Sequence, residues 1–200
     1  VSGRATAYIG TSGVGGLGAI YSNSAIDGGG IAIISGAAEG ADSKVFLYTT
    51  DPSLPVTVRG NYASDTGGGV YLQSFFGAIA LSIGSLCALD FRFEDNAARD
   101  GSALYLNSDS IIGIYLGSRV TLNPVGDCTR PGAVRCASGI PCNTISGNDA
   151  VNTDGGFSDG ATLRLLPSSF LRASRFEMQG NRARDAIRTN GDPDEPANIY

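Results

Sequence analysis

The sequence predicts an all-β fold assembled from short repeated strands, and three observations carry that prediction. One phrase recurs five times: an apolar residue, two variable residues, Asn, one variable residue, then Ala. Apolar residues alternate with polar ones around these phrases, which is the period of a strand with one buried face. Glycine is abundant, with 29 of 200 residues, and only 16% of the residues are charged. A helical bundle needs many more charged helix formers than this.

The five copies place an asparagine at their fourth position and are spaced 38, 35, 52 and 33 residues apart. A unit of this length without a helical period cannot bury its apolar side chains alone and must stack on its neighbours. We therefore expect a single-stranded parallel β-helix (β-solenoid) of about five coils. The repeated asparagines then lie above one another inside a turn and form a structural ladder; they are Asn23, Asn61, Asn96, Asn148 and Asn181.

Each repeat is expected to hold three strands. One runs into the Asn phrase, one follows a glycine run, as at 31–33, 70–72, 104–106 and 163–165, and a middle one lies between them, as at 45–47, 79–83 and 112–116. An acidic residue or Asn stands four residues after each Asn, and glycine follows it in most copies. This pattern is typical of a turn, because Asp and Asn side chains bond to the nearby backbone and glycine adopts positive φ. These residues are Asp27, Asp65, Asp100, Asn152 and Asp185.

The repeats resemble those of polymorphic outer-membrane proteins, bacterial autotransporter passengers and related surface proteins. The resemblance rests on Gly68-Gly69-Val70-Tyr71-Leu72, on Gly101-Ser102-Ala103-Leu104-Tyr105 and on the Phe93-Glu-Asp-Asn96 phrase, and covers roughly residues 18 to 188. Only Phe93 keeps the aromatic residue of the family's Phe-x-x-Asn phrase. The resemblance implies a right-handed β-helix with an adhesive or display role at the cell surface. We expect residues 1–200 to form one such domain, as part of a longer chain.

The 52-residue interval contains a predicted loop insertion at 123–143, which carries three prolines and three of the four cysteines. A loop without a core of its own is typically stapled by disulfides, and an even cysteine count fits an oxidising compartment. Zinc binding by Cys128, Cys136 and Cys142 is the weaker alternative because their spacing matches no zinc pattern. Of the three possible pairings we favour Cys128 with Cys136, and Cys87 with Cys142 one coil apart.

Composition excludes several classes of function. Histidine is absent, so triads that use it are excluded, and the net charge of −5 argues against binding nucleic acid through phosphate contacts. No apolar run approaches the length needed for this segment to insert into a membrane.

The chain opens without a leader, so we expect a secreted or outer-membrane surface protein whose signal peptide is removed or lies outside the sequence. We expect no cofactor.

Three sets of side chains are candidates for binding, and each also has a purely structural interpretation. The aspartates after the Asn phrases could bind calcium, but turn capping explains them better. The aromatic residues Tyr71, Phe75, Phe76, Tyr105 and Tyr115 could stack on sugars or on one another. A candidate ligand surface for an anionic polysaccharide comprises Arg164, Arg172, Arg175, Arg182, Arg184 and Arg188.

Two functions from different classes follow. The favoured one is a non-catalytic surface or secreted module, an adhesin or a passenger stalk, that presents loops to a glycan or a host-surface protein. The alternative is a fragment of a polysaccharide lyase or hydrolase, since the same fold hosts such enzymes. A phage or capsular fibre is a third, smaller option. The adjacent Asp pair and the His typical of pectin hydrolases are absent. The oligomeric state stays open.

Overall fold

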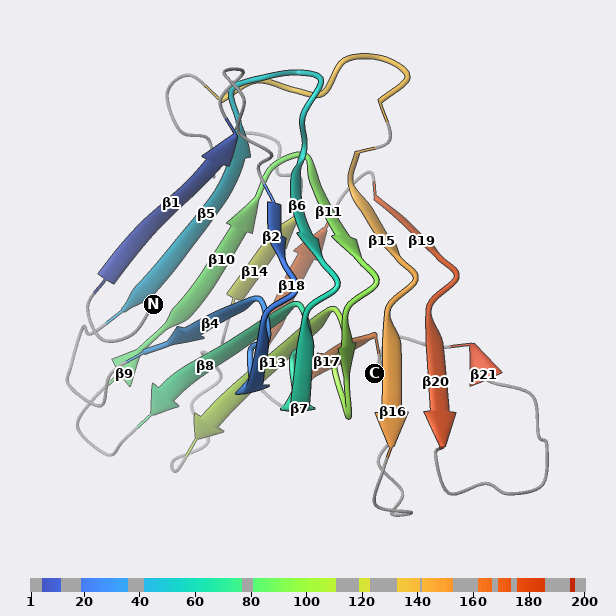
Figure 1. The fold of residues 1–200 in the computed structure, drawn as a ribbon. Helices are drawn as coiled ribbons and strands as arrows, with labels where there is room; N and C mark the ends of the chain where they lie inside the picture. Colours follow the sequence, from blue (N-terminus) through green and yellow to red (C-terminus); the bar gives the residue numbers. More distant parts are fainter. Residues whose placement is uncertain are drawn as a thin grey trace.

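The computed structural model describes residues 5–11, 19–35, 42–76, 81–110, 119–122, 133–140, 142–152, 162–166, 169–173, 176–185 and 195–196. Within these ranges every regular element is a β-strand, and strands from distant parts of the sequence lie side by side (Figure 1). No helix in the described ranges is long and apolar enough to cross a membrane. The prediction of an all-β fold with parallel sheets is confirmed.

The strands form four sheets, which we number I to IV in the order in which the chain reaches them. Sheet I holds β1 (Ala5–Thr11), β5 (Ser43–Thr49), β10 (Gly84–Ala88), β14 (Arg119–Leu122) and β18 (Phe170–Ala173). Sheet II holds β2 (Ala19–Tyr21), β6 (Val56–Arg59), β11 (Phe91–Glu94), β15 (Thr144–Ser146) and β19 (Glu177–Gln179).

Sheet III holds β3 (Ser24–Asp27), β7 (Tyr62–Thr66), β12 (Ala97–Ala98), β16 (Asp149–Asn152), β20 (Arg182–Asp185) and β21 (Glu195–Pro196). Sheet IV holds β4 (Ile31–Ile34), β8 (Val70–Phe76), β13 (Leu104–Ser110) and β17 (Leu163–Leu165), with β9 (Leu81–Ser82) paired to β8. Among the described pairs only β8–β9 and β20–β21 are antiparallel.

The chain visits sheets I, II, III and IV in the same order in four successive passes, each of which adds one strand to each sheet, and the described part of a fifth pass adds strands to sheets I, II and III. The expected three strands per repeat are wrong, because every complete pass has four. The missed strand follows the Asn and has two to five residues, so it has little alternation to recognise, and it leads into turn residues. The middle strand expected at 79–83 is also displaced: β10 begins at Gly84, and residues 77–80 and 111–118 lie outside the described ranges.

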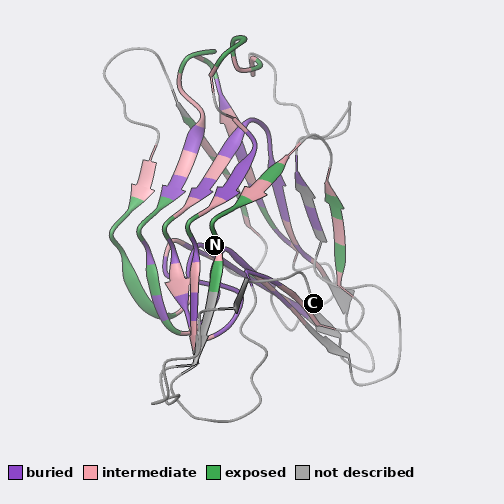
Figure 2. Cartoon of the chain, turned by 90° about the vertical axis from the view of Figure 1, so that its right-hand side faces the viewer, coloured by how far each residue is buried: buried purple, intermediate pink, exposed green. Residues whose placement is uncertain are grey.

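Inward-pointing residues of sheets I, II and IV form one apolar core, which Figure 2 shows as bands of buried residues crossing neighbouring strands. Leu72 and Leu106 lie opposite each other in β8 and β13, and both are fully buried. The rings of Phe91 and Phe93 pack inside sheet II with centroids 4.9 Å apart. In-register parallel pairing thus places residues of successive passes in columns.

The corner between sheets II and III has the same backbone conformation in all five passes. The residue before each repeated Asn has a left-handed φ; these residues are Ser22, Gly60, Asp95, Gly147 and Gly180, with φ between 53° and 65°. Glycine adopts this conformation without strain, and Ser and Asp are short enough to tolerate it. The chain turns here, and the asparagine that follows points inward.

The five asparagines form a hydrogen-bonded column. In the first four, the backbone N–H and the side-chain Nδ2 both donate to Oδ1 of the Asn in the next pass; from Asn61 to Asn96 the distances are 3.1 and 3.0 Å. Nδ2 also donates to a backbone carbonyl of the preceding pass, as from Asn96 to Val58 at 2.9 Å. Asn61, Asn96 and Asn148 are at most 1% exposed. These buried amides are therefore bonded at both Nδ2 and Oδ1.

Glycines allow successive passes to approach closely at the next corner, between sheets III and IV. A Cβ on Gly69 would lie 2.6 Å from the carbonyl oxygen of Ala103 and 3.3 Å from Nδ2 of Asn96. Gly28, Gly67 and Gly101 also have left-handed φ at this corner. The glycine runs therefore supply both the turn conformation and the space that stacking requires.

Candidate functional site

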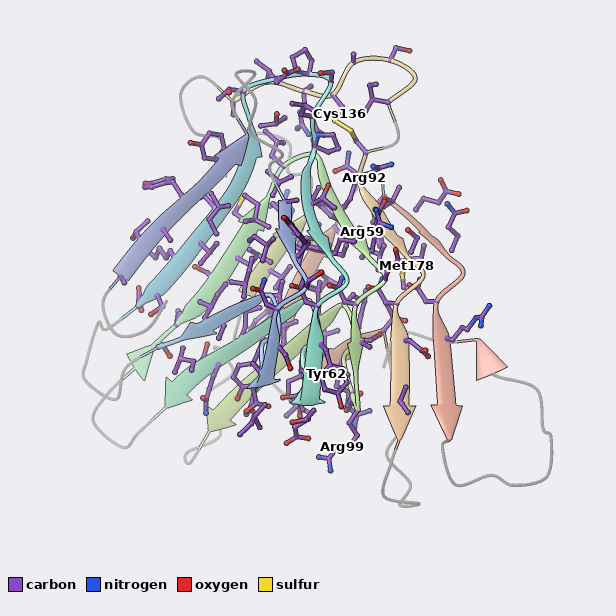
Figure 3. The ribbon with its side chains drawn as sticks, in the orientation of Figure 1. Arg59, Tyr62, Arg92, Arg99, Cys136 and Met178 are labelled. Carbon is purple, nitrogen blue, oxygen red and sulfur yellow. A yellow bond between two sulfur atoms is a disulfide. The ribbon has the colours of Figure 1, made fainter. Side chains whose placement is uncertain are left out.

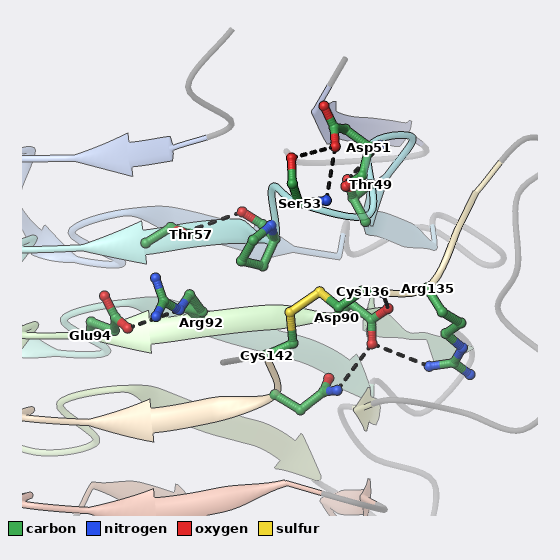
Figure 4. Close-up of a disulfide and its surroundings, with 12 residues drawn as sticks. Thr49, Asp51, Ser53, Thr57, Asp90, Arg92, Glu94, Arg135, Cys136 and Cys142 are labelled. Carbon is green, nitrogen blue, oxygen red and sulfur yellow. Dashed lines mark hydrogen bonds and ion pairs between the residues drawn. A yellow bond between two sulfur atoms is a disulfide. The ribbon is translucent and has the colours of Figure 1, made fainter. Parts of the chain in front are cut away.

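The candidate site is the surface loop before β15, of which residues 133–140 and 142–143 are described. Cys136 and Cys142 form a disulfide with a Cα–Cα distance of 6.5 Å (Figure 4). The disulfide closes a local ring of chain that stands outside the four sheets. Between the two cysteines, Ala137, Ser138 and Gly139 are exposed.

Asp90 anchors this loop to the sheets. It lies between β10 and β11, with φ 52°, and is 3% exposed. Its carboxylate accepts hydrogen bonds from the backbone N–H of Cys136 at 2.6 Å and from Nδ2 of Asn143 at 3.0 Å (Figure 4). Arg135 adds an ion pair through Nη1 at 3.5 Å. Hydrogen bonds to a charged acceptor are stronger than neutral ones, so one buried carboxylate holds both ends of the ring.

The loop also rests on the turn that follows β5, two passes earlier. Val134 donates its N–H to the carbonyl of Thr49 at 2.9 Å, and Ala137 donates to that of Pro52 at 2.7 Å. The supporting turn is internally bonded, because the hydroxyl and N–H of Ser53 both donate to Asp51. These bonds lower the pKa of the Asp51 carboxyl below its ordinary value of 3.8. The loop therefore has a rigid base.

The tip of the loop is a tight turn. Ile140 donates its N–H to the carbonyl of Ala137 at 3.2 Å, and Gly139 has φ 86° in the third position of the turn. A type II turn requires positive φ at that position. A Cβ added to Gly139 would meet nothing within 4 Å, so the tip faces open space.

The expected disulfide pairings are wrong, because Cys136 pairs with Cys142 and so with neither Cys128 nor Cys87. Cys87 is itself disulfide-bonded, and Cys128 lies outside the described residues. The error arose from treating Cys87 and Cys142 as equivalent positions in successive passes. Cys87 lies in sheet I and is in register with Phe46 and Thr121, whereas Cys142 lies just before a strand of sheet II.

The predicted arginine surface is divided among three sheets. Arg164 lies in sheet IV, Arg172 in sheet I, and Arg182 and Arg184 in sheet III. Arg164 is half-buried and pairs through Nε with the carboxylate of Asp100 at 3.3 Å. Arg175 and Arg188 lie outside the described residues. The described arginines therefore do not form one binding face.

Other arginines are paired on the outer faces of sheets II and III. Figure 3 shows Arg59 and Arg92 beside the strands of sheet II. Their Nε atoms lie 3.2 Å from carboxylate oxygens of Asp95 and Glu94, respectively. Arg99 makes an ion pair with Asp65. Each of these three arginines therefore has an acidic partner on its own face.

The predicted aromatic residues form stacks along the columns. Tyr71 and Tyr105 stack with centroids 5.8 Å apart, between Ala32 and Arg164 in the same column. Burial raises the pKa of the Tyr105 hydroxyl above its ordinary value of 10.0, and the Asp100 carboxylate adds to the effect. Tyr115 and the side chains of Phe75 and Phe76 lie outside the described parts. A second stack, between Tyr8 and Phe46 at 5.0 Å, was missed by the sequence analysis.

The acidic column is interrupted. Asp27 is in register with Thr66, which in turn bridges to Asp100, because β7 has one extra residue relative to β3. The Thr66 hydroxyl donates to Asp27 at 2.5 Å, and Asp100 accepts from the N–H of Gly101 at 2.9 Å. Within the described ranges no three acidic or cysteine side chains are grouped as metal ligands. The described aspartates here act in turns, ion pairs and strand contacts.

Asp90 was missed by the sequence analysis, although a weak signal exists. Asp90 and Asn143 each stand immediately before a strand of sheet II, and both have left-handed φ. An Asp or Asn at that position in two successive passes is typical of a corner with a local side-chain bond.

Comparison of the chain with protein-family models, with curated proteins and with solved structures finds no match in any of the three. The structure itself defines the class: an all-β protein of parallel sheets with a disulfide-closed surface loop. A disulfide of this kind fits an extracellular or otherwise oxidising compartment.

Proposed function

We propose that this chain is a segment of a right-handed parallel β-helix that serves as a non-catalytic scaffold on a bacterial surface or in a secreted protein. The repeated four-sheet order and the asparagine column support the coil architecture. Each complete pass is then one coil, and the five passes are the predicted five coils.

The observation that carries the functional proposal is the anchoring of the Cys136–Cys142 loop. Asp90 bonds the loop at Cys136, and backbone bonds from Val134 and Ala137 fix it to the turn after β5. An exposed tip on a rigid base loses little conformational entropy on binding, which favours affinity. The loop thus acts as an adhesive element, and its partner is a glycan or a host-surface protein.

A substitution at the tip tests this role. Ser138→Arg places a large side chain at the exposed turn without contacting the sheets, so attachment of the protein to host cells or to an array of glycans is expected to fall at least tenfold. Ser64→Arg, on the outer face of β7, is the matched control because Ser64 is equally an exposed serine. Attachment that responds equally to the two variants, or to neither, would overturn the proposed role of the loop.

A further inference from the structure

The two sides of the Cys136–Cys142 ring are tethered by hydrogen bonds that involve no sulfur atom. On the first side, the N–H of Cys136 donates to the carboxylate of Asp90 at 2.6 Å (Figure 4). Ala137 donates its N–H to the carbonyl of Pro52 at 2.7 Å. These bonds fix the backbone of Cys136 against the protein whether or not its sulfur is bonded.

The Cys142 side is tethered through the next residue, Asn143. Its Nδ2 donates to the same carboxylate of Asp90 at 3.0 Å, and its carbonyl accepts a hydrogen bond from the N–H of Glu177 at 2.9 Å. Strand β15 begins at Thr144 and pairs with β11 and β19. Opening the disulfide therefore leaves the bonds on both sides of the ring in place, and Asp90 takes part in the bonds on each side.

From these contacts we propose that Asp90 is a positioning residue, which keeps the sulfurs of Cys136 and Cys142 within reach of each other when the bond between them is reduced. Two groups that other contacts hold close together react at a high effective concentration. The ring therefore re-forms in preference to staying open, and the bond resists reduction by small thiols. This role goes beyond the proposed adhesive function and does not depend on a partner.

The reaction is thiol–disulfide exchange, with glutathione as the reductant. Cys136 and Cys142 are both partly exposed, so a glutathione thiolate attacks one sulfur, forms a mixed disulfide and releases the other sulfur as a thiolate. A second glutathione then attacks the mixed disulfide, so that two electrons and two protons pass to the two cysteines and glutathione disulfide leaves. The released cysteine thiolate competes with this second step by attacking the mixed disulfide, which closes the ring and expels glutathione. Tethering favours that return.

Two substitutions of Asp90 separate tethering from charge. Asp90→Ala removes the bonds to both sides of the ring. In Asp90→Asn, the new amide oxygen accepts the bond from Cys136, and the new NH2 group donates to Oδ1 of Asn143 once that amide flips. Oδ1 of Asn143 is buried and accepts no hydrogen bond from the described residues, so the flip breaks no other contact at this atom. Asp90→Asn therefore keeps both tethers without the charge.

The equilibrium constant for closing the ring with glutathione disulfide measures the effect. The folded proteins are equilibrated at a series of glutathione ratios, quenched in acid and alkylated, and the peptides that carry Cys136 and Cys142 are quantified by mass spectrometry. We expect the constant to fall at least about tenfold in Asp90→Ala, which raises the reduction potential by about 30 mV. In Asp90→Asn we expect a fall of less than about threefold, because only the strengthening by charge is lost.

Asn96→Ala is the control, because it removes buried hydrogen bonds at a corner away from the loop. Its constant is expected to stay within about twofold of the wild-type value, since distant sites act independently. A fall smaller than tenfold in Asp90→Ala overturns the proposal. An equal fall in Asn96→Ala also overturns it, because the effect then follows general loss of stability. An equal fall in Asp90→Asn assigns the effect to charge and overturns the tethering.

A double substitution, Cys136→Ser with Cys142→Ser, tests the tethers with Asp90 intact. This variant cannot form the bond, but the backbone N–H at position 136 still has its acceptor in Asp90. We expect hydrogen exchange at this amide to be faster than in the wild type by less than about tenfold, because a bonded amide stays protected. A larger increase would show that the disulfide itself holds the ring in place, and it would overturn the proposal.

Discussion

Asn96 donates twice to one oxygen of Asn148: its backbone N–H and its Nδ2 both lie 3.0 Å from Oδ1. The two residues are 52 positions apart in the sequence, across the longest interval between repeats. The bond geometry nevertheless matches that between Asn61 and Asn96, which are 35 positions apart. The inserted loop is therefore accommodated outside the stack without disturbing it.

Replacing Asn96 with Ala is expected to lower the free energy of unfolding by about 2 to 4 kcal/mol, because buried groups of Asn61, Asn148 and Val58 lose their partner. Asn107→Ala is the control. Asn107 lies outside the column and is not fully buried, and its Nδ2 contact to the Tyr71 hydroxyl is long, at 3.5 Å, so we expect a loss of about 0.5 kcal/mol. Chemical denaturation of both variants measures the difference. Equal losses would show that the column contributes no special stability.

Substitution of Asp90 is expected to loosen the disulfide loop. Asp90→Ala leaves the N–H of Cys136 and the amide of Asn143 without their acceptor and is expected to cost about 2 to 3 kcal/mol. Faster hydrogen exchange at the Cys136 amide would locate the effect. Asp95→Asn is the control: Asp95 also has left-handed φ, but it is exposed, and its ion pair with Arg59 contributes within about 0.5 kcal/mol. Unchanged exchange in Asp90→Ala would show that the loop is held by other contacts.

A methyl group at Gly69 is expected to destabilise the protein through steric overlap. The Cβ of Gly69→Ala would lie 2.6 Å from the carbonyl of Ala103, so the backbone must shift, at a cost of about 2 to 3 kcal/mol. Gly60→Ala separates this effect from backbone strain, because Gly60 has φ 61° but nothing within 4 Å of an added Cβ. We expect about 1 kcal/mol for it. Thermal unfolding that ranks Gly60→Ala as the more damaging change would contradict the close approach of the second and third passes at this corner.

Stability is expected to fall at alkaline pH through Tyr105. Burial, assisted by Asp100, raises the pKa of its hydroxyl above 10.0 in the folded protein, so folding favours the protonated form. That contribution is fully present below the unfolded pKa and is lost as the pH rises through the folded value. Tyr105→Phe removes the ionisation, and its stability should therefore decline less steeply above pH 10. Parallel denaturation curves for wild type and variant across that range would refute the linkage.

The repeat predicted which asparagines are neighbours because in-register parallel strands bring together residues that are one repeat apart. That rule holds for Asn61, Asn96 and Asn148 irrespective of the loop lengths between them, and it also predicts the parallel sheets. The same rule failed for Cys87 and Cys142, because it applies only to residues in the same sheet. The number of sheets depends on corners such as the one at Asp95, where the left-handed position is occupied by Ser, Gly or Asp in different passes, so no single residue type marks it.

The sequence by itself determined the all-β class, the parallel stacking and the identity of the inward-facing asparagines, since these follow from local alternation and repeat spacing. Only the tertiary structure decided that Cys136 pairs with Cys142, that Asp90 anchors the loop, and that Arg164, Arg172 and Arg182 lie in three different sheets. The physical reason is that these relationships depend on how many corners separate two residues and on contacts between loops. Neither the number of corners nor a contact between loops produces a repeating pattern of residues along the chain.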